Sequence, residues 1–292
     1  MPAPYDERVP DVTRDHRTFT DARGVVIHYY VWAAAQPRAV VQLAHGLGEH
    51  ALRYEWTAQR LVAAGYTVVA DDHRGHGATG MEQYGGDASR LGRLGPGGLR
   101  ATMSGISQLT GIIRDEHPEL PIVLLGHSWG SLMAQHLVNV DPEPYAAVVL
   151  TGTAFRTLRH MNSGDLNRLH KHLGTTGNEW LSRDPEVAAA FAADPLTFYA
   201  DVPKLFGYVD ALRLLGRPRR MTKDLPVLIM IGAEDSLGGE ASVRLLEAAY
   251  RGKAKLSDVT TVVYPEARHE VFNELNRDEV VDDLIEWVDA RL

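Results

Sequence analysis

The sequence contains no cysteine, which excludes disulfides, thiolate metal sites and a cysteine nucleophile. It also has no run near the ~20 apolar residues that cross a bilayer. The first 17 residues lack the apolar centre of a secretory signal. We therefore expect a cytoplasmic protein without a transmembrane segment. A mature secreted form whose signal had been removed would look the same.

An excess of positive charge is missing as well. The 30 lysines and arginines are outnumbered by 38 acidic residues, which gives a formal net charge of −8. Nucleic-acid binding normally needs a basic surface, so we expect no nucleic-acid partner. One local group of arginines is interpreted as the solvated edge of a loop rather than as a phosphate site: Arg213, Arg217, Arg219 and Arg220.

What the chain does contain is an alternation of short apolar runs with amphipathic segments. With 45% hydrophobic residues in 292, it can bury a large core. We expect strands at 25–32, 39–46, 66–72, 121–128, 145–153, 226–235 and 259–267, and helices at 53–65, 98–118, 129–140, 241–250 and 277–292. Such strands, separated by helices, indicate a mostly parallel sheet with helices on both faces. The first two strands have no helix between them, which indicates an antiparallel edge.

Residues 154–222 interrupt this alternation, since they carry helical patterns but no buried strand. We expect a helical insertion in a core formed by residues 1–153 and 223–292. Leucines and a methionine recur near helical spacing at Leu158, Met161, Leu166, Leu169 and Leu173. Basic residues interleave with them at His160, Arg168, His170, Lys171 and His172. The pattern predicts an amphipathic segment whose basic face is solvated or rests transiently on anionic lipid.

Ser128 lies at the centre of Gly126-His127-Ser128-Trp129-Gly130, between an apolar strand and a helix. Ligands of open parallel sheets bind beyond the carboxyl ends of the strands. Gly-x-Ser-x-Gly at such a point holds a serine in a tight turn with its hydroxyl exposed, because the flanking glycines remove side chains that would clash. The pattern predicts a nucleophile. A serine that only caps the helix is the alternative.

A serine hydroxyl needs a general base, and the base needs an orienting acid. Asp235 closes the apolar strand 226–235, and His269 follows the strand 259–267. Both therefore lie at carboxyl ends of strands and follow Ser128 in the order serine, acid, histidine. Glu234 is the competing acid. The alternatives without chemistry are a turn-forming aspartate and a histidine in a surface loop.

Acyl transfer also needs two N–H donors for the developing oxyanion. The backbone N–H of Trp129 directly follows the candidate nucleophile. The second candidate is the N–H of Leu47, in a loop after the strand 39–46, where Gly46 and Gly48 permit a tight turn. A glycine-rich turn without chemistry is the alternative for this loop.

Four motifs together resemble the α/β-hydrolase superfamily, and most closely its monoacylglycerol lipase and lysophospholipase branch, the serine aminopeptidase group. They are HGLGEH at 45–50, DDHRGHGATG at 71–80, GHSWGS at 126–131, and GAEDS with YPEARHEVFNE at 232–236 and 264–274. The resemblance spans residues 18–292. It implies a mostly parallel eight-stranded sheet with a lid at 154–222. It also implies Ser128 as nucleophile, Asp235 as acid, His269 as base, and Leu47 and Trp129 as oxyanion donors. Trp129 stands where this branch commonly has methionine, which narrows the expected acyl pocket.

The expected function is that of a serine carboxylester hydrolase that acts through an acyl-enzyme on a small-molecule ester or lipid, such as a monoacylglycerol or lysophospholipid. No cofactor is expected. No metal is expected either, because no carboxylate cluster completes the histidine pairs His45 with His50 and His73 with His76. An amidase, a peptidase or a carbon–carbon hydrolase would use the same triad. A non-catalytic binding protein on this fold is a further alternative.

Overall fold

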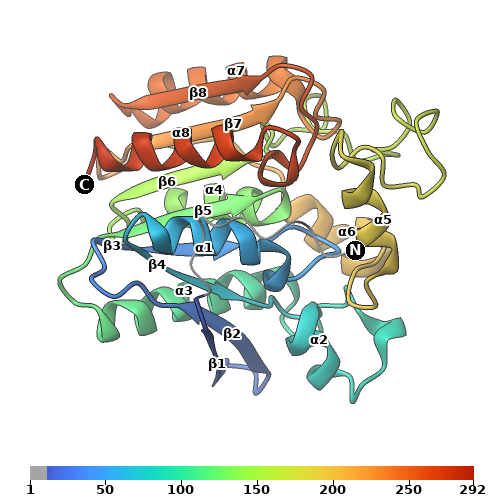
Figure 1. Ribbon diagram of the computed structural model, residues 1–292, viewed down its shortest axis with the longest axis horizontal. Helices are drawn as coiled ribbons and strands as arrows, with labels where there is room; N and C mark the ends of the chain where they lie inside the picture. The colour runs from blue at the N-terminus through green and yellow to red at the C-terminus, as the bar shows by residue number, and fades with distance from the viewer. Residues whose placement is uncertain (1–11) are drawn as a thin grey trace.

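The computed structural model describes residues 12–292 and places eight strands in one sheet, in the order β1-β2-β4-β3-β5-β6-β7-β8 (Figure 1). The strands are β1 (Arg14–Thr20), β2 (Val26–Trp32), β3 (Ala39–Ala44), β4 (Tyr66–Asp71), β5 (Ile122–His127), β6 (Ala147–Thr151), β7 (Val227–Gly232) and β8 (Val259–Tyr264). From β4 through β3 to β8 every pairing is parallel, whereas β2 is antiparallel to both of its neighbours. The mostly parallel sheet with an antiparallel edge is therefore confirmed. The first two predicted strands, 25–32 and 39–46, do not pair with each other, because β4 lies between β2 and β3 and the antiparallel partners of β2 are β1 and β4.

The strand β1 is not among those expected from apolar runs. It pairs with β2 alone, at the edge of the sheet, and all of its side chains are exposed or half-buried. Its sequence, RDHRTFT, has no apolar periodicity. Hydrophobic patterning detects strands that bury a face, so a polar edge strand gives no such signal.

Helices cover both faces of the sheet, as predicted. The helices outside the insertion are α1 (Glu55–Ala63), α2 (Gly77–Gln83), α3 (Gly98–Glu116), α4 (Trp129–Val140), α7 (Gly239–Ala249) and α8 (Arg277–Asp289), with short η helices at Ala51–Tyr54, Ala88–Arg90, Tyr250–Ala254 and Val271–Asn273. Apolar residues of α1 and α8 share one core cluster, and those of α3, α4 and α7 share another. Alternate residues of the strands supply both clusters. Of these six helices, only α2 was not expected from the pattern.

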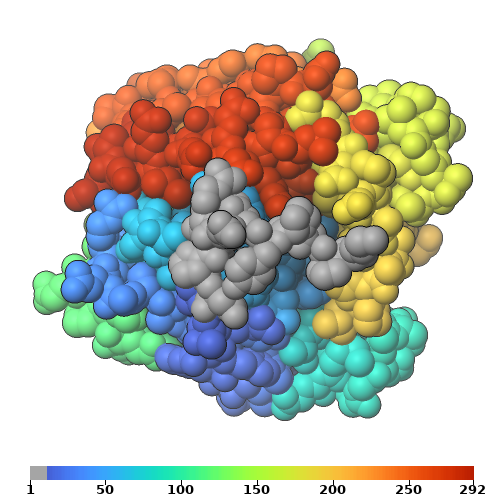
Figure 2. Space-filling view, in the orientation of Figure 1, coloured from blue at the N-terminus to red at the C-terminus, as the bar shows by residue number. Residues whose placement is uncertain are grey.

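Residues 154–222 lie between β6 and β7 and contain two helices, α5 (Pro185–Ala193) and α6 (Val202–Arg213). Figure 1 places both helices at one end of the sheet, and in the space-filling view the yellow insertion forms that end of the molecule (Figure 2). The prediction of helical structure from the leucines between 158 and 173 is wrong, because residues 154–184 form turns and bends. Asn-Ser-Gly at 162–164 and Gly-Thr-Thr-Gly at 174–177 favour turns and interrupt the helical spacing.

No helix in the described part of the chain is long and apolar enough to span a membrane.

Candidate active site

Ser128 lies in a strained turn between β5 and α4. Its backbone has φ 51° and ψ −120°, a conformation that residues other than glycine rarely adopt. The two flanking glycines are required by close packing. A Cβ on Gly126 would lie 2.7 Å from the carbonyl oxygen of Gly130, and one on Gly130 would lie 2.0 Å from that of Ala44. The sequence motif therefore has a steric cause.

Asp235 and His269 meet just beyond β7 and β8, which are neighbours in the sheet. The Nδ1 atom of His269 lies 3.0 Å from Oδ2 of Asp235, and both side chains are fully buried. Burial lowers the pKa of His269, but the charge and the hydrogen bond of Asp235 outweigh it, so the pKa lies above its ordinary value. The competing acid, Glu234, is exposed.

The other ring nitrogen of His269 is available for chemistry. Its Nε2 atom is buried and has no hydrogen-bond partner within residues 12–292. The imidazole ring lies 4.8 Å from that of His127, the residue before Ser128. Gly152, at the end of β6, makes this approach possible, since a Cβ there would lie 2.9 Å from Cε1 of His269. The fold thus brings an imidazole with an unpartnered nitrogen to the strand end that carries Ser128.

The loop after β3 lies directly against the serine. A Cβ on Gly46 would be 3.1 Å from Cβ of Ser128. The N–H of Gly46 donates to Oε1 of Glu49, whereas the N–H of Leu47 donates to none of the other described residues. The N–H of Trp129 is the first of α4 and therefore has no partner within the helix. Two backbone donors without partners in the helix or loop thus lie next to Ser128.

Three other histidines near the site, His45, His73 and His76, stack on one another or on Trp129. The rings of His45 and His73 stack at 4.0 Å, and the ring of His76 stacks on Trp129 at 5.1 Å. Burial lowers the pKa of His76 to about 3, so that side chain is neutral at pH 7. Nε2 of His45 accepts the backbone N–H of His73, which ties the loop after β3 to the loop after β4. Within residues 12–292 no cluster of three or more His, Cys, Asp or Glu side chains could hold a metal ion.

The insertion covers both sides of this site. The ring of Phe206 lies 5.2 Å from that of Trp129, and the N–H of Phe198 donates to the carbonyl oxygen of Gly48. The ring of Trp180 lies 4.6 Å from His269. Trp180 was not identified from the sequence, because a single tryptophan in a polar segment has no pattern that points to a site.

Residues 179–183 fasten the insertion to the loop that carries His269. The carbonyl oxygens of Glu179 and Ser182 accept from Arg268, and Arg183 forms an ion pair with the buried Glu274. The N–H groups of His269 and Glu270 donate to the carbonyl oxygens of residues 180 and 181. This part of the insertion therefore supports the histidine, in addition to covering it.

A family model described as "Serine aminopeptidase, S33" matches residues 35–276. A monoacylglycerol lipase of Mycolicibacterium smegmatis is 36% identical and aligns over 96% of this chain and 99% of its own. The human monoglyceride lipase is 27% identical, over 98% of this chain and 93% of its own.

Solved structures show the same relation. A structure titled "Lipase (Open form)" has a TM-score of 0.78 at 27% identity and covers 95% of this chain and 99% of its own. A soluble variant of the Saccharomyces cerevisiae monoglyceride lipase, in complex with a substrate analogue, has a TM-score of 0.74 at 18% identity over 99% of this chain and 98% of its own. At that identity the second structure shows the fold alone.

Proposed function

Because the chain belongs to the serine aminopeptidase S33 family of serine hydrolases that act on esters, we propose that Ser128, His269 and Asp235 form its catalytic triad. The observation that carries this proposal is the buried pair of His269 Nδ1 and Asp235 Oδ2, 3.0 Å apart. It leaves His269 Nε2 without a partner beside the strand end of Ser128. An oriented imidazole with a free nitrogen beside a serine supports this role, since activation requires that nitrogen to take the hydroxyl proton.

In the proposed mechanism, Ser128 Oγ attacks the acyl carbonyl while His269 Nε2 takes its proton. Asp235 holds the N–H of His269 Nδ1 and stabilises the imidazolium. The N–H groups of Leu47 and Trp129 donate to the oxyanion, and the loss of one such donor typically raises the barrier by about 3 kcal/mol. His269 then returns the proton to the leaving alcohol. Water then attacks the acyl-enzyme while His269 takes its proton, and His269 returns that proton to Ser128 Oγ as the acid is released.

The proposed substrate is a monoacylglycerol or a similar ester with one acyl chain, such as a lysophospholipid. Two observations support it. Curated relatives over nearly the whole chain are named monoacylglycerol or monoglyceride lipases. In addition, an apolar cluster that includes Leu132, Leu47 and Phe206 surrounds Trp129, next to the proposed nucleophile. An amide substrate would use the same triad and is the second candidate.

A panel of p-nitrophenyl esters of rising acyl length, a monoacylglycerol and aminoacyl nitroanilides tests this proposal. We expect the esters and the monoacylglycerol to be hydrolysed and the anilides to be turned over far more slowly. The Trp129→Met variant is expected to prefer longer acyl chains than wild type, because the smaller side chain frees space between His76 and Phe206. Negligible turnover of every ester would overturn the function. An unchanged chain-length profile in Trp129→Met would contradict the role of the tryptophan side chain.

We also propose that the protein is located in the cytoplasm. Residues 154–222 act as a lid, and the lid touches lipid surfaces. Seven large apolar side chains of the insertion are at least half exposed: Leu158, Leu169, Leu173, Tyr199, Tyr208, Val209 and Leu212. An excess of exposed apolar side chains in one segment is compatible with an interaction surface, and these seven all belong to the insertion.

Co-sedimentation with vesicles of anionic phospholipid checks this contact. The double variant Tyr208→Ser, Leu212→Ser is expected to bind vesicles at least several-fold more weakly than wild type, since it removes two exposed apolar side chains of α6. The matched control is Val140→Ser, which removes an apolar side chain of similar exposure outside the insertion. Equal binding by all three proteins would contradict the proposed contact.

A further inference from the structure

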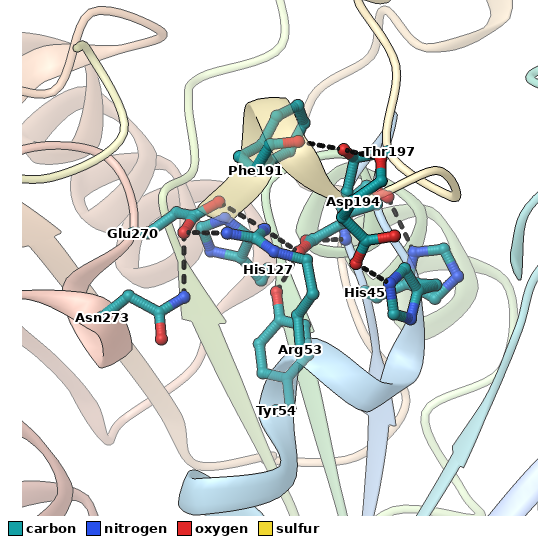
Figure 3. Close-up of polar contacts among 12 residues, drawn as sticks. His45, Arg53, Tyr54, His127, Phe191, Asp194, Thr197, Glu270 and Asn273 are labelled. Atoms are coloured by element: carbon teal, nitrogen blue, oxygen red, sulfur yellow. Dashed lines mark hydrogen bonds and ion pairs between the residues drawn. The ribbon is translucent and has the colours of Figure 1, made fainter. Parts of the chain in front are cut away.

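A buried ion network lies next to the proposed triad, centred on Arg53 (Figure 3). Nη1 and Nη2 of Arg53 each donate to one carboxylate oxygen of Glu270, both at 2.7 Å. Nη1 also donates to Glu49 at 2.5 Å. The side chains of Arg53, Glu49 and Glu270 are 11%, 3% and 5% exposed, so water contributes little to their solvation. The ring of Phe191, on α5, lies 4.8 Å from the guanidinium carbon and adds to its cover.

Each end of the network is attached to one of the two loops that form the site. Oε1 of Glu49 accepts the backbone N–H of Gly46 at 2.6 Å, directly before the proposed oxyanion donor Leu47. The same oxygen accepts the hydroxyl of Tyr54 at 2.7 Å. Glu270 directly follows the proposed base, His269. The bidentate bond from Arg53 to Glu270 therefore links residues 217 positions apart in the chain across the two loops.

The network carries one net negative charge, since one guanidinium faces two carboxylates. Burial opposes the charge of Glu270, but Arg53 outweighs it and lowers the pKa of this carboxyl to about 2. Both carboxylates, together with Asp235, raise the pKa of His269. The other titratable neighbour, His127, is neutral because burial and the adjacent His269 lower its pKa to about 3. The negative potential at His269 thus comes from Asp235 and from this network.

We propose that Arg53, Glu49 and Glu270 are positioning residues, which hold the loop of Leu47 and the loop of His269 in register and supply negative potential to the imidazole. This inference rests on the proposed function, since it assigns these residues a part in the same reaction.

Stability alone is a weak account of the network. Taking charges out of water is costly, and well-packed apolar residues of similar volume often stabilise a fold as well as or better than a buried ion network. Here Glu49 accepts the N–H of Gly46, which directly precedes the proposed oxyanion donor. Arg53 donates to Glu270, which directly follows the proposed base. Bidentate pairing also fixes geometry, because the planar guanidinium donates two parallel N–H bonds and the carboxylate oxygens accept both in only one orientation. The placement therefore favours a role in aligning the two loops.

The test measures the pH profile of kcat/KM for a p-nitrophenyl ester in Glu270→Gln. We expect kcat to fall about tenfold with little change in KM, and the acid limb to move by about one pH unit to lower pH. The sign follows from charge: without this carboxylate the imidazolium is less stable, so His269 loses its proton at lower pH. Glu49→Gln keeps an acceptor for the N–H of Gly46 but removes its charge, and it is expected to move the acid limb in the same direction.

Glu274→Gln is the matched control. Glu274 is a buried carboxylate in the same loop, but its ion-pair partner is Arg183 of the insertion, and its Oε1 accepts the backbone N–H groups of Arg183 and Arg268. Gln keeps these acceptors and removes only the charge. Loss of the Glu274 charge is expected to lower the midpoint temperature of unfolding and to leave the acid limb of the kcat/KM profile unmoved. The inference is wrong if folded Glu270→Gln and Glu49→Gln keep the wild-type acid limb and kcat, or if Glu274→Gln moves the limb equally. A wild-type protein that hydrolyses no ester would instead overturn the proposed function, so the two failures are distinguishable.

Discussion

Replacement of Ser128 by alanine is expected to lower kcat for ester hydrolysis by about 10⁵-fold or more. The variant loses the atom that is proposed to form the acyl-enzyme, and loss of the nucleophile in a triad removes almost all of the rate that the triad provides. The change deletes one oxygen at a turn with φ 51°. Alanine and serine carry the same Cβ, so the strain of this turn is unchanged and the fold is expected to persist. KM is expected to change little where the variant's residual rate can be measured.

Covalent labelling with a fluorophosphonate, together with steady-state kinetics, measures this effect. Wild type is expected to label and Ser128→Ala is not. Ser107→Ala, at an exposed position of α3, is the control for the loss of a serine hydroxyl, and we expect it to retain wild-type labelling and kcat. A Ser128→Ala protein with activity within tenfold of wild type would show that another residue is the nucleophile.

The Asp235→Asn variant is expected to lose about 10⁴-fold in kcat, because an amide no longer holds His269 in the required tautomer or stabilises its cation. It is also expected to change the pH dependence. The ordinary pKa of histidine is 6.5, and that of His269 is raised, so wild-type kcat/KM rises with pH through a midpoint above 6.5. Without the charge of residue 235 the imidazole loses its proton at lower pH, so the midpoint moves down.

The neighbouring Glu234→Gln supplies the comparison for this prediction. It removes one carboxylate at the adjacent position, but Glu234 is exposed, so water screens its charge. Its kcat and its acid limb are expected to match those of wild type. If Glu234→Gln lost activity and Asp235→Asn kept it, the roles assigned to the two acids would be reversed. Circular dichroism of both variants establishes that any loss is not one of folding.

The parts of the fold that bury apolar surface could be predicted from the sequence. Buried strands such as β5 and β7 are nearly continuous apolar runs, and α3 and α8 show clear helical spacing. The same signal was misleading at residues 158–173, where the spacing of leucines does not overcome the turn-forming residues between them. It was absent at β1, whose side chains mostly face water.

The candidate site divides in a similar way. The tight turn of Ser128 and the positions of Asp235 and His269 follow from motifs at the ends of apolar strands. The structure places Asp235 Oδ2 3.0 Å from His269 Nδ1. The role of Arg53 could not be predicted, since its bonds to Glu270 depend on how two distant loops come together. A charged residue beside a helix start looks the same in a sequence whether it is solvated or buried.

The attachment of residues 179–183 to the loop of His269 has a consequence for protein engineering. A chimera that exchanges all of 154–222 for the insertion of a relative would replace three residues that contact this loop. They are Trp180, which packs on His269, Ser182, which accepts from Arg268, and Arg183, which pairs with Glu274. Such a graft alters the support of the proposed base together with the aromatic cover of Trp129. Exchanging residues 195–215 alone leaves that support in place, so this shorter segment is the unit to recombine when only substrate preference is to be changed.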